Sequence, residues 1–284
     1  MKRMIPVCVL LLLACAPLVR ADVLYSNLTV TDAMAMASRP GVTGKIEIEA
    51  ADDFVLLSPA IINQVTFIGL ITGGTTANVN DINVEAYRVF PNDSNVSRTS
   101  GPPTFSTPNV PTRVNSPSDV LFAQEDNLTG GLSCSSTVLA TSFTAANSVL
   151  NGIHALPNQT TGGEGPVTGE EVQFTCGIAN PIVFPADHYF FVPQVGVTGA
   201  GEFYWLSAAR PTSFPAGFTD LQTWIRNGNL DPDWLRVGTD IVGGTTPPTF
   251  NAAFQLNGTT IPEPTSVLLV IGAAPLLLRR LRKS

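Results

Sequence analysis

The chain has 284 residues, of which 44% are hydrophobic and 13% are charged, and its formal net charge at pH 7 is −7. This length supplies enough apolar side chains for one large domain or two small ones. The acidic balance excludes a surface built to hold nucleic acid, because phosphate groups are bound by clusters of Lys and Arg. The sequence therefore predicts a folded, acidic protein with no nucleic-acid partner.

The N-terminus has the pattern of a secretory signal peptide. Two basic residues precede an apolar run from Met4 to Leu18, and Val19-Arg20-Ala21 resembles the small-x-small site of signal peptidase. We expect residues 1–21 to be removed, so that the mature chain begins at Asp22. The alternative is a lipoprotein signal, in which the lipobox-like stretch Leu12 to Cys15 would place a lipid on Cys15.

The body of the chain predicts an all-β fold. Short segments rich in Val, Ile, Phe and Thr recur between Gly, Pro, Asn and Ser, and no helical period is sustained. In chain order, the predicted strands are Lys45–Ala50, Phe54–Leu57, Ile62–Thr72, Ile82–Phe90, Thr137–Ala145, Glu171–Ile178, His188–Val197, Glu202–Ala208 and Phe250–Gly258. Such a series is typical of an antiparallel β-sandwich, and we expect the jelly-roll type.

Four segments interrupt this series of strands. The Met- and Ala-rich segment Thr31–Gly41 predicts a helical turn, and Leu221–Asn229 predicts a short helix. The Pro-, Ser- and Thr-rich stretch Pro91–Asp119 and the Gly-rich stretch Pro157–Glu171 predict two long loops. We expect all of these to belong to one ectodomain of residues 22–256.

Cys134 and Cys176 are the two cysteines that remain once the signal peptide is removed. In an oxidising compartment a lone pair is expected to form a disulfide rather than a metal site, and two buried thiols are the alternative. Closing the loop between them would stabilise the fold by about 4 kcal/mol in the chain-entropy model.

The body contains no motif that predicts catalysis. His188 lies beside Asp187 at the start of an apolar strand, but no nucleophile turn of the G-x-S-x-G kind accompanies it, so we interpret it as a strand-edge histidine. Asp52 and Asp53 would point to opposite faces of a strand, so they cannot flank one glycosidic bond together. We expect these two carboxylates to form a turn or to be solvated at the start of a strand.

Calcium is the one cofactor that the residues suggest. Asp231 and Asp233, with Asn227 and Asn229, place oxygen-bearing side chains at alternate positions, and calcium takes six to eight oxygen ligands. The order of these residues differs from that of a dedicated calcium loop, and Asx-turns are the alternative explanation.

Two tryptophans flank the same segment. Trp224 and Trp234 lie near acidic and amide residues, and an apolar surface with a polar rim is a common form of ligand site. We take them as a candidate carbohydrate patch, and packing in the core is the alternative.

The C-terminus combines a rigid motif, an apolar stretch and a basic end. The motif Pro262-Glu263-Pro264 precedes an uncharged stretch, Thr265–Leu278, which ends in the basic residues Arg279, Arg280, Arg282 and Lys283. As a helix the stretch would be roughly 21 Å long, short of a hydrocarbon core of about 30 Å, and snorkelling basic side chains extend its reach. By the positive-inside rule the basic end stays cytoplasmic. We expect a spacer at residues 257–264 and a transmembrane helix with its basic tail at residues 265–284.

These C-terminal residues resemble the PEP-CTERM sorting signal of Gram-negative bacteria that make exopolysaccharide. The resemblance covers Ile261–Ser284 in order and spacing. It implies a transient anchor in the inner membrane, cleavage near the Pro-Glu-Pro motif by an exosortase, and release to the cell surface or the extracellular matrix. Asp52-Asp53-Phe54 followed by Ser58–Gly69 is also similar to the opening of β-sandwich ectodomains common among PEP-CTERM proteins, which implies the architecture alone.

The net charge of the body and the resemblance of the C-terminal tail together indicate an exported protein. Without its two ends the chain keeps 8 of its 15 basic residues and 21 of its 22 acidic residues, a net charge of about −13. We expect an exported protein of the cell surface or biofilm matrix, with a structural or adhesive role and no catalysis. Two alternatives are a carbohydrate-binding β-sandwich that acts on exopolysaccharide and a secreted polysaccharide hydrolase.

Overall fold

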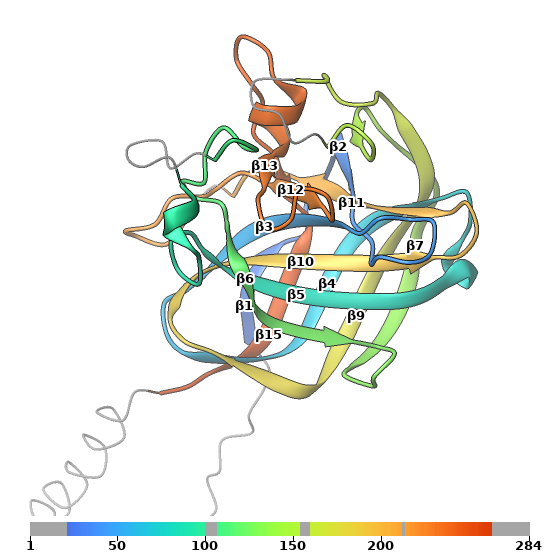
Figure 1. Cartoon of the computed structure of the whole chain (residues 1–284). Helices are drawn as coiled ribbons and strands as arrows, with labels where there is room; N and C mark the ends of the chain where they lie inside the picture. The colour runs from blue at the N-terminus through green and yellow to red at the C-terminus, as the bar shows by residue number, and fades with distance from the viewer. Residues whose placement is uncertain (1–21, 100–106, 154–159, 212–213, 263–284) are drawn as a thin grey trace, which may run out of the picture.

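The computed structural model describes residues 22–99, 107–153, 160–211 and 214–262, and these residues form an all-β fold of fifteen strands in two sheets (Figure 1). In Figure 1 the smaller sheet lies in front, and strands of the larger sheet cross behind it at a steep angle. Within the described ranges all strand pairs are antiparallel except β2 with β8. The predicted all-β class is confirmed, and the jelly-roll connectivity stays a prediction.

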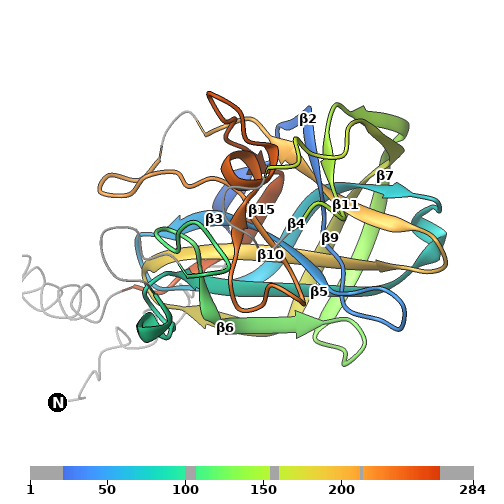
Figure 2. The ribbon, with the colours of Figure 1, turned by 45° about the horizontal axis from the view of Figure 1, so that its top comes forward.

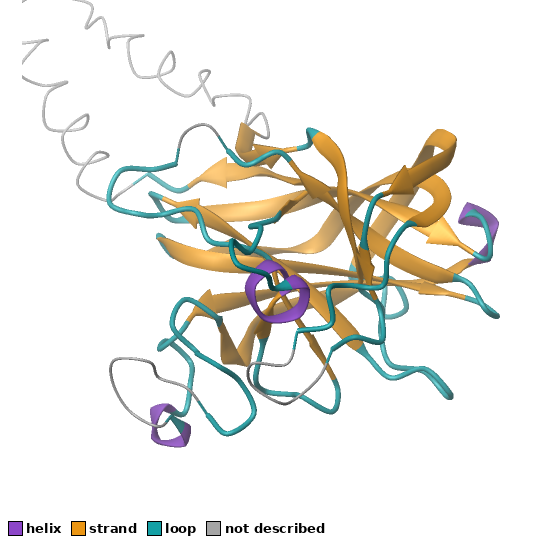
Figure 3. Cartoon of the chain, turned by 90° about the horizontal axis from the view of Figure 1, so that it is seen from above, coloured by secondary structure: helices purple, strands orange, loops and turns teal. Residues whose placement is uncertain are grey.

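The two sheets differ in size. The nine-stranded sheet contains β1 (Asp22–Asn27), β15 (Phe254–Thr260), β4 (Ala60–Thr72), β11 (Glu202–Ala208), β2 (Val30–Ala37) and β8 (Ser148–Val149) in spatial order, with β14 (Asn251–Ala252) on β11, β9 (Val167–Phe184) on β4 and β7 (Leu132–Ala145) on β9. The six-stranded sheet has the order β13 (Leu235–Arg236), β12 (Trp224–Asn227), β3 (Ile48–Leu56), β10 (Asp187–Val197), β5 (Val79–Val89) and β6 (Pro117–Asp126). The helical turns η2 (Thr76–Asn78) and η3 (Val96–Arg98) lie at the rim of the view in Figure 3, and η4 (Val237–Val242) lies at its centre.

An aromatic core joins the two sheets. Phe191 of β10 stacks on Phe254 of β15 with ring centroids 5.1 Å apart, and it also contacts Phe67 of β4 and Trp205 of β11. All four side chains are buried, and each contributes about 1.5–3 kcal/mol by leaving water. The alternation that predicted the strands therefore points one face of each sheet into this shared core.

The six-stranded sheet is buried on its outer face as well. Along β10, Tyr189 and Phe191 belong to the core between the sheets, whereas Phe190 and Val192 belong to a second apolar cluster. The segment that carries β12 and β13 covers this face. The second cluster consists of Ala51, Tyr87, Phe190, Val192, Leu221, Trp224 and Trp234. A sheet buried on both faces explains why His188–Val197 reads as a nearly continuous apolar run.

The helical turn predicted at Thr31–Gly41 is wrong, because residues 30–37 form strand β2. This strand lies between β11 and β8, and the side chains of Met34 and Met36 are fully buried. Ala and Met are good helix formers, but propensity differences are below about 1 kcal/mol per residue, so two neighbouring strands and a buried face override them.

The short helix predicted at Leu221–Asn229 is also wrong. Residues 224–227 form strand β12, which pairs with β3 on one side and β13 on the other. The chain turns directly after the strand, where the carbonyl oxygen of Asn227 accepts hydrogen bonds from the N–H groups of Leu230 and Asp231. The aromatic and β-branched residues Trp224 and Ile225 suit a strand, and pairing at the sheet edge decides the outcome.

Asp52 and Asp53 lie in the middle of β3, not in a turn or in solvent, so the two strands predicted on either side of them are one. Both carboxylates are fully buried. Asp52 accepts hydrogen bonds from the Thr223 hydroxyl and the Ala252 N–H, and Asp53 accepts one from the Leu221 N–H. Because these donors replace water, the strand continues through two acidic residues.

The disulfide between Cys134 and Cys176 is present and joins β7 to β9, where the two residues face each other in register. Among the described residues, no helix has the length and apolar character needed to cross a membrane. The predicted signal peptide, Cys15, and the tail from Glu263 to Ser284 lie outside the described residues. Of the sorting motif, Pro262 alone is described.

Candidate functional site

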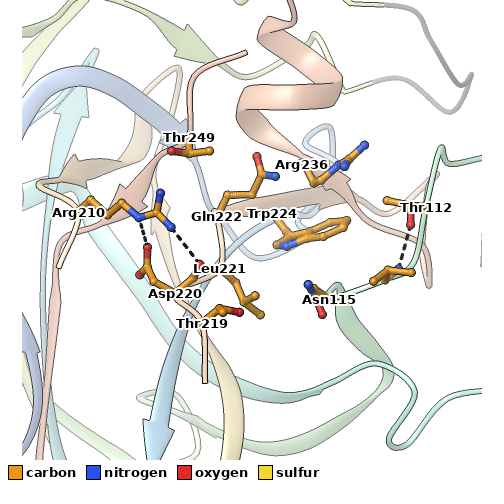
Figure 4. A pocket seen from close by; sticks show the side chains of 11 residues that line it. Thr112, Asn115, Arg210, Thr219, Asp220, Leu221, Gln222, Trp224, Arg236 and Thr249 are labelled. Atoms are coloured by element: carbon orange, nitrogen blue, oxygen red, sulfur yellow. Dashed lines mark hydrogen bonds and ion pairs between the residues drawn. The ribbon is translucent and has the colours of Figure 1, made fainter. Parts of the chain in front are cut away.

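A polar cavity of about 320 Å³ lies beside β12 and is the strongest candidate site. Four segments distant in sequence line it, including the predicted long loop Pro91–Asp119 and the chain between β11 and β12 (Figure 4). Its lining residues are Thr112, Val114, Asn115, Arg210, Thr219, Asp220, Leu221, Gln222, Trp224, Arg236 and Thr249. We call this site the Trp224 cavity.

Trp224 is held rigidly at the cavity. Its strand position lies between Ala51 of β3 and Arg236 of β13, and its indole is 1% exposed. The Arg236 guanidinium lies 5.9 Å from the indole centroid and forms an ion pair with Asp240 at 2.7 Å. The indole N–H of Trp224 is buried and donates to no protein atom. A buried donor without an acceptor costs about 1–3 kcal/mol. The nitrogen has almost no surface open to the cavity, so the part of Trp224 that lines the cavity is its ring.

An ion pair forms the opposite wall. Nε of Arg210 donates to Oδ2 of Asp220 at 2.7 Å, and the Arg210 side chain is 60% exposed (Figure 4). The other carboxylate oxygen of Asp220 accepts a hydrogen bond from the Asn251 side chain. Asp220 is thereby fixed by two partners, whereas Arg210 can reorient toward a ligand at the mouth of the cavity.

The predicted long loop supplies the third side of the cavity. Asn115 adopts a left-handed backbone conformation with φ of 63°, which a non-glycine residue rarely does outside turns and functional sites. Ion pairs from Arg98 and Arg113 to Asp119 fasten the loop, and Arg98 also bonds to Asp233. These charge pairs therefore hold the described parts of the loop, residues 91–99 and 107–119, although the composition of the loop resembles that of a linker.

The cavity suits a neutral, hydroxyl-rich ligand better than a strongly charged one. Arg210 is paired with Asp220 and Arg236 with Asp240, so the fixed charges at its wall balance. The Asn115 and Gln222 amides and the Thr219 and Thr249 hydroxyls offer donors and acceptors of the kind that sugar hydroxyls need.

The two predicted ligand-patch residues do not form one exposed surface. Trp234, like Trp224, is buried, and the Arg226 guanidinium lies 4.3 Å from its ring centroid. Trp224 lines the cavity, whereas Trp234 packs against Tyr87 in the outer apolar cluster. The two side chains therefore do not share one apolar surface with a polar rim, and the burial of both agrees with the alternative of packing in the core.

The two carboxylates predicted as calcium ligands are bonded to arginines. Asp231 accepts a hydrogen bond from Arg226 at 2.6 Å, and Asp233 accepts one from Arg98 at 3.0 Å and one from the Thr107 hydroxyl. Within the described ranges, no group of three or more His, Cys, Asp or Glu side chains is placed to hold a metal ion. Asn227 accepts hydrogen bonds from the backbone of its own turn, which is the Asx-turn alternative.

His188 is paired with a residue that sequence order does not suggest. Its ring nitrogen Nε2 lies 2.6 Å from Oδ2 of Asp53, while its neighbour Asp187 accepts only the backbone N–H of His188. The imidazole is 9% exposed and contacts the rings of Phe214 and Phe218. It is therefore a buried, paired histidine, not one at an open strand edge.

A buried polar cluster on the outer face of the six-stranded sheet was missed by the sequence analysis. We call it the outer-face network, and it comprises Glu49, Asn83, Glu85, Tyr87, Gln194 and Arg226. The Tyr87 hydroxyl lies 2.8 Å from Oε1 of Glu49 and 3.0 Å from Oε2 of Glu85, and Arg226 donates both to Glu49 and to Tyr87. The alternation of the strands points these residues away from the central core, but it carries no sign that a second layer covers them.

Burial controls protonation in this network. Burial raises the pKa of Glu85 to about 8, and the nearby charge of Glu49 adds to the rise. Glu85 is therefore protonated at neutral pH and can donate to Tyr87, which donates to Glu49. Burial also raises the pKa of Tyr87. The nearby carboxylate of Glu49 raises the pKa of Arg226 despite its burial, so the guanidinium stays charged. The network holds β12 against β3 and β5.

No protein-family model, no curated protein and no solved structure matches the chain.

Proposed function

We propose that the chain is an exported protein of the cell surface or extracellular matrix, with a structural or adhesive role and no catalysis. Signal peptidase would release the mature chain at Asp22. The tail would hold the chain transiently in the inner membrane until an exosortase acts at Pro262-Glu263-Pro264. Support comes from the sorting tail and from the disulfide, which suits an oxidising compartment.

The pairing of the first and last strands is the observation that carries this proposal. Asp22 of β1 faces Gly258 of β15, so the expected mature N-terminus and the stem of the tail lie at the same edge of the fold (Figure 1). The last contact of the body is a hydrogen bond from the Ile261 N–H to the Pro59 carbonyl oxygen, and Pro262 is exposed. A processing enzyme would thus meet the motif directly beyond the folded body.

Fractionation of cells tests this function. The full chain is expected in the surface or matrix fraction without the residues after Glu263, and a chain lacking Ile261–Ser284 is expected as soluble protein in the periplasm or medium. The matched control replaces Pro262 and Pro264 by Ala and keeps the apolar stretch. It should stay in the membrane fraction, because anchoring persists without processing. Mature surface protein that still carries Leu276–Ser284 would overturn the proposal.

A second candidate function is binding of exopolysaccharide at the Trp224 cavity. The favouring observation is the position of the cavity relative to the tail. Asp220 of the cavity is bonded to Asn251, directly before β15, and the tail follows the end of β15. The seven residues of β15 separate the cavity from the start of the tail by roughly 20 Å. A chain tethered by its tail would therefore present the cavity away from the membrane.

Binding of neutral polysaccharide fragments to purified full-length chain, measured by calorimetry, tests this candidate. Trp224→Phe should weaken binding severalfold, because the smaller ring reshapes the wall of the cavity while most of the packing is kept. Trp234→Phe is the matched control, since that indole is equally buried, also lacks a hydrogen-bond partner and does not line the cavity. Equal loss in both variants, or no binding by the unmodified chain, would rule it out. Release of new reducing ends would favour a hydrolase instead.

A further inference from the structure

Strand β7 is an edge strand of unusual length. It spans 14 residues, and among the described residues it pairs only with β9, on one side (Figure 2). The backbone N–H and C=O groups that face away from β9 therefore have no strand partner. Such an edge is a template for pairing with another strand.

The edge lacks the charged residues with which proteins usually protect exposed strands. The sequence from Asn127 to Gly163 contains no Asp, Glu, Lys or Arg, although the ectodomain as a whole carries a net charge of about −13. Strand β7 also has no proline, and Val138 and Leu139 are 41% and 46% exposed. In an acidic protein, this is the strand along which two copies can approach without facing like charges.

The order of residues in β7 is nearly palindromic in chemical class. If two copies pair antiparallel about a two-fold axis between Val138 and Leu139, each of these residues faces the other in the partner. The pairs flanking this centre are Thr137 with Ala140, Ser136 with Thr141, Ser135 with Ser142, Cys134 with Phe143 and Ser133 with Thr144. Three of these pairs bring hydroxyl groups face to face, which is a favourable cross-strand combination.

We propose that β7 is a self-association surface, at which two copies of this chain pair edge to edge in antiparallel orientation with Val138 opposite Leu139. The contact is isologous, since each copy contributes the same residues, and it closes as a two-fold dimer. It needs neither the tail nor the Trp224 cavity, so it stands independently of the proposed function. In a surface or matrix protein, it would join neighbouring chains into a joint sheet.

Irregularities in the strand limit the strength of this contact. The register between β7 and β9 shifts between Val138 and Ala140 and again between Ala140 and Phe143. Bulges twist an edge and reduce its pairing, so the dimer is a dissociable one that forms at high local concentration. If the proposed function holds, display of many copies on one surface would supply such a concentration, but the pairing itself does not depend on it.

Sedimentation of the full-length chain in a density-matched non-ionic detergent tests the pairing. The unmodified chain is expected to dimerise, and Val138→Lys or Leu139→Glu alone should each raise the dissociation constant at least tenfold. An equimolar mixture of the two variants should regain dimers, because Lys at 138 then faces Glu at 139 of the partner. Leu57→Lys, at a side chain 67% exposed between β3 and β4, is the matched control and should dimerise like the unmodified chain.

Three results would overturn the proposal. The first is an unmodified chain that stays monomeric at the highest soluble concentration. The second is dimers that persist in both edge variants, which would place the contact in the tail or elsewhere. The third is a mixture that fails to recover, which would exclude the pairing of Val138 with Leu139. A structural defect in the variants would not produce recovery on mixing.

Discussion

Oδ2 of Asp53 lies 2.6 Å from Nε2 of His188, and Oδ1 of the same carboxylate accepts the backbone N–H of Leu221 at 3.1 Å. One buried side chain on β3 is thus bonded both to β10 and to the segment that lines the Trp224 cavity. Burial raises the pKa of Asp53 to about 6, and the hydrogen bond from His188 counteracts part of this rise. The carboxylate fixes the position of the cavity wall relative to the sheet.

Replacing Asp53 by Ala is expected to lower the free energy of unfolding by about 2–6 kcal/mol, because two buried donors lose their acceptor at about 1–3 kcal/mol each. Urea denaturation measures the change. Asp187→Ala is the control, since that carboxylate is part-exposed and bonds only to a neighbouring backbone N–H, apart from a longer ion pair with Arg88. A loss in Asp53→Ala no greater than in the control would contradict the anchoring role.

The pH dependence of stability should reveal the protonated state of Glu85. Its pKa is raised by burial from 4.5 to about 8 in the folded chain, where Glu49, Tyr87 and Arg226 are its titratable neighbours. The folded protein therefore binds more protons than the unfolded chain between these values, so the free energy of unfolding decreases as pH rises from about 4.5 to about 8. One proton corresponds to at most about 1.4 kcal/mol per pH unit.

Glu85→Gln should reduce this dependence, because the neutral amide imitates the protonated carboxyl group. The part that remains comes from Asp52, since burial raises the pKa of that carboxyl well above its usual value. Melting temperatures between pH 6 and pH 8 measure the effect, with an expected fall of about 3–5 °C per unit in the unmodified chain. The raised pKa of Asp53, about 6, also makes the free energy of unfolding decrease as pH rises, but it does so mainly below this pH range. Parallel curves for the two proteins would show that Glu85 is ionised in the fold.

The outer-face network depends on Arg226. Arg226→Met is expected to cost about 3–5 kcal/mol of stability, since it leaves the buried Glu49 carboxylate without its guanidinium. Arg210→Met provides the comparison, because the Arg210 side chain in its pair with Asp220 is 60% exposed and such pairs contribute about 1 kcal/mol or less. Equal losses of stability in the two variants would contradict the larger contribution that we assign to Arg226.

The disulfide between β7 and β9 should contribute measurably to stability. Its ends are separated by 42 residues, and the chain-entropy model gives about 4 kcal/mol for a loop of that size. The double variant Cys134→Ser with Cys176→Ser should therefore melt about 8–16 °C lower. Reductant should lower the melting temperature of the unmodified chain to the same value and leave the variant unchanged. If reductant leaves the melting temperature of the unmodified chain unchanged, the two cysteines are free thiols.

Sequence reasoning succeeded where the signal is local. Alternation along Ile82–Phe90 identified β5, since a residue's face follows from the pleat alone, whereas of Lys45–Ala50 only residues 48–50 lie in a strand, the start of β3. It failed at Thr31–Gly41, where helix-favouring residues lie between two strands, and at Asp52 and Asp53, whose burial depends on donors more than a hundred residues away. The candidate cavity was found only in part, through Trp224, because its other walls come from segments that no sequence pattern connects.

By itself, the order of residues determined the all-β class and the pairing of the two cysteines, and it supplies the case for an export signal and a sorting tail. These properties follow from periodicity, composition and motifs within short windows of the chain. Tertiary structure alone decided which carboxylates are buried, that Glu85 keeps its proton, and that Trp224 faces a cavity while Trp234 does not. The physical reason is that desolvation and hydrogen-bond partners arise from segments brought together in space, and a local pattern does not record which distant groups will cover it.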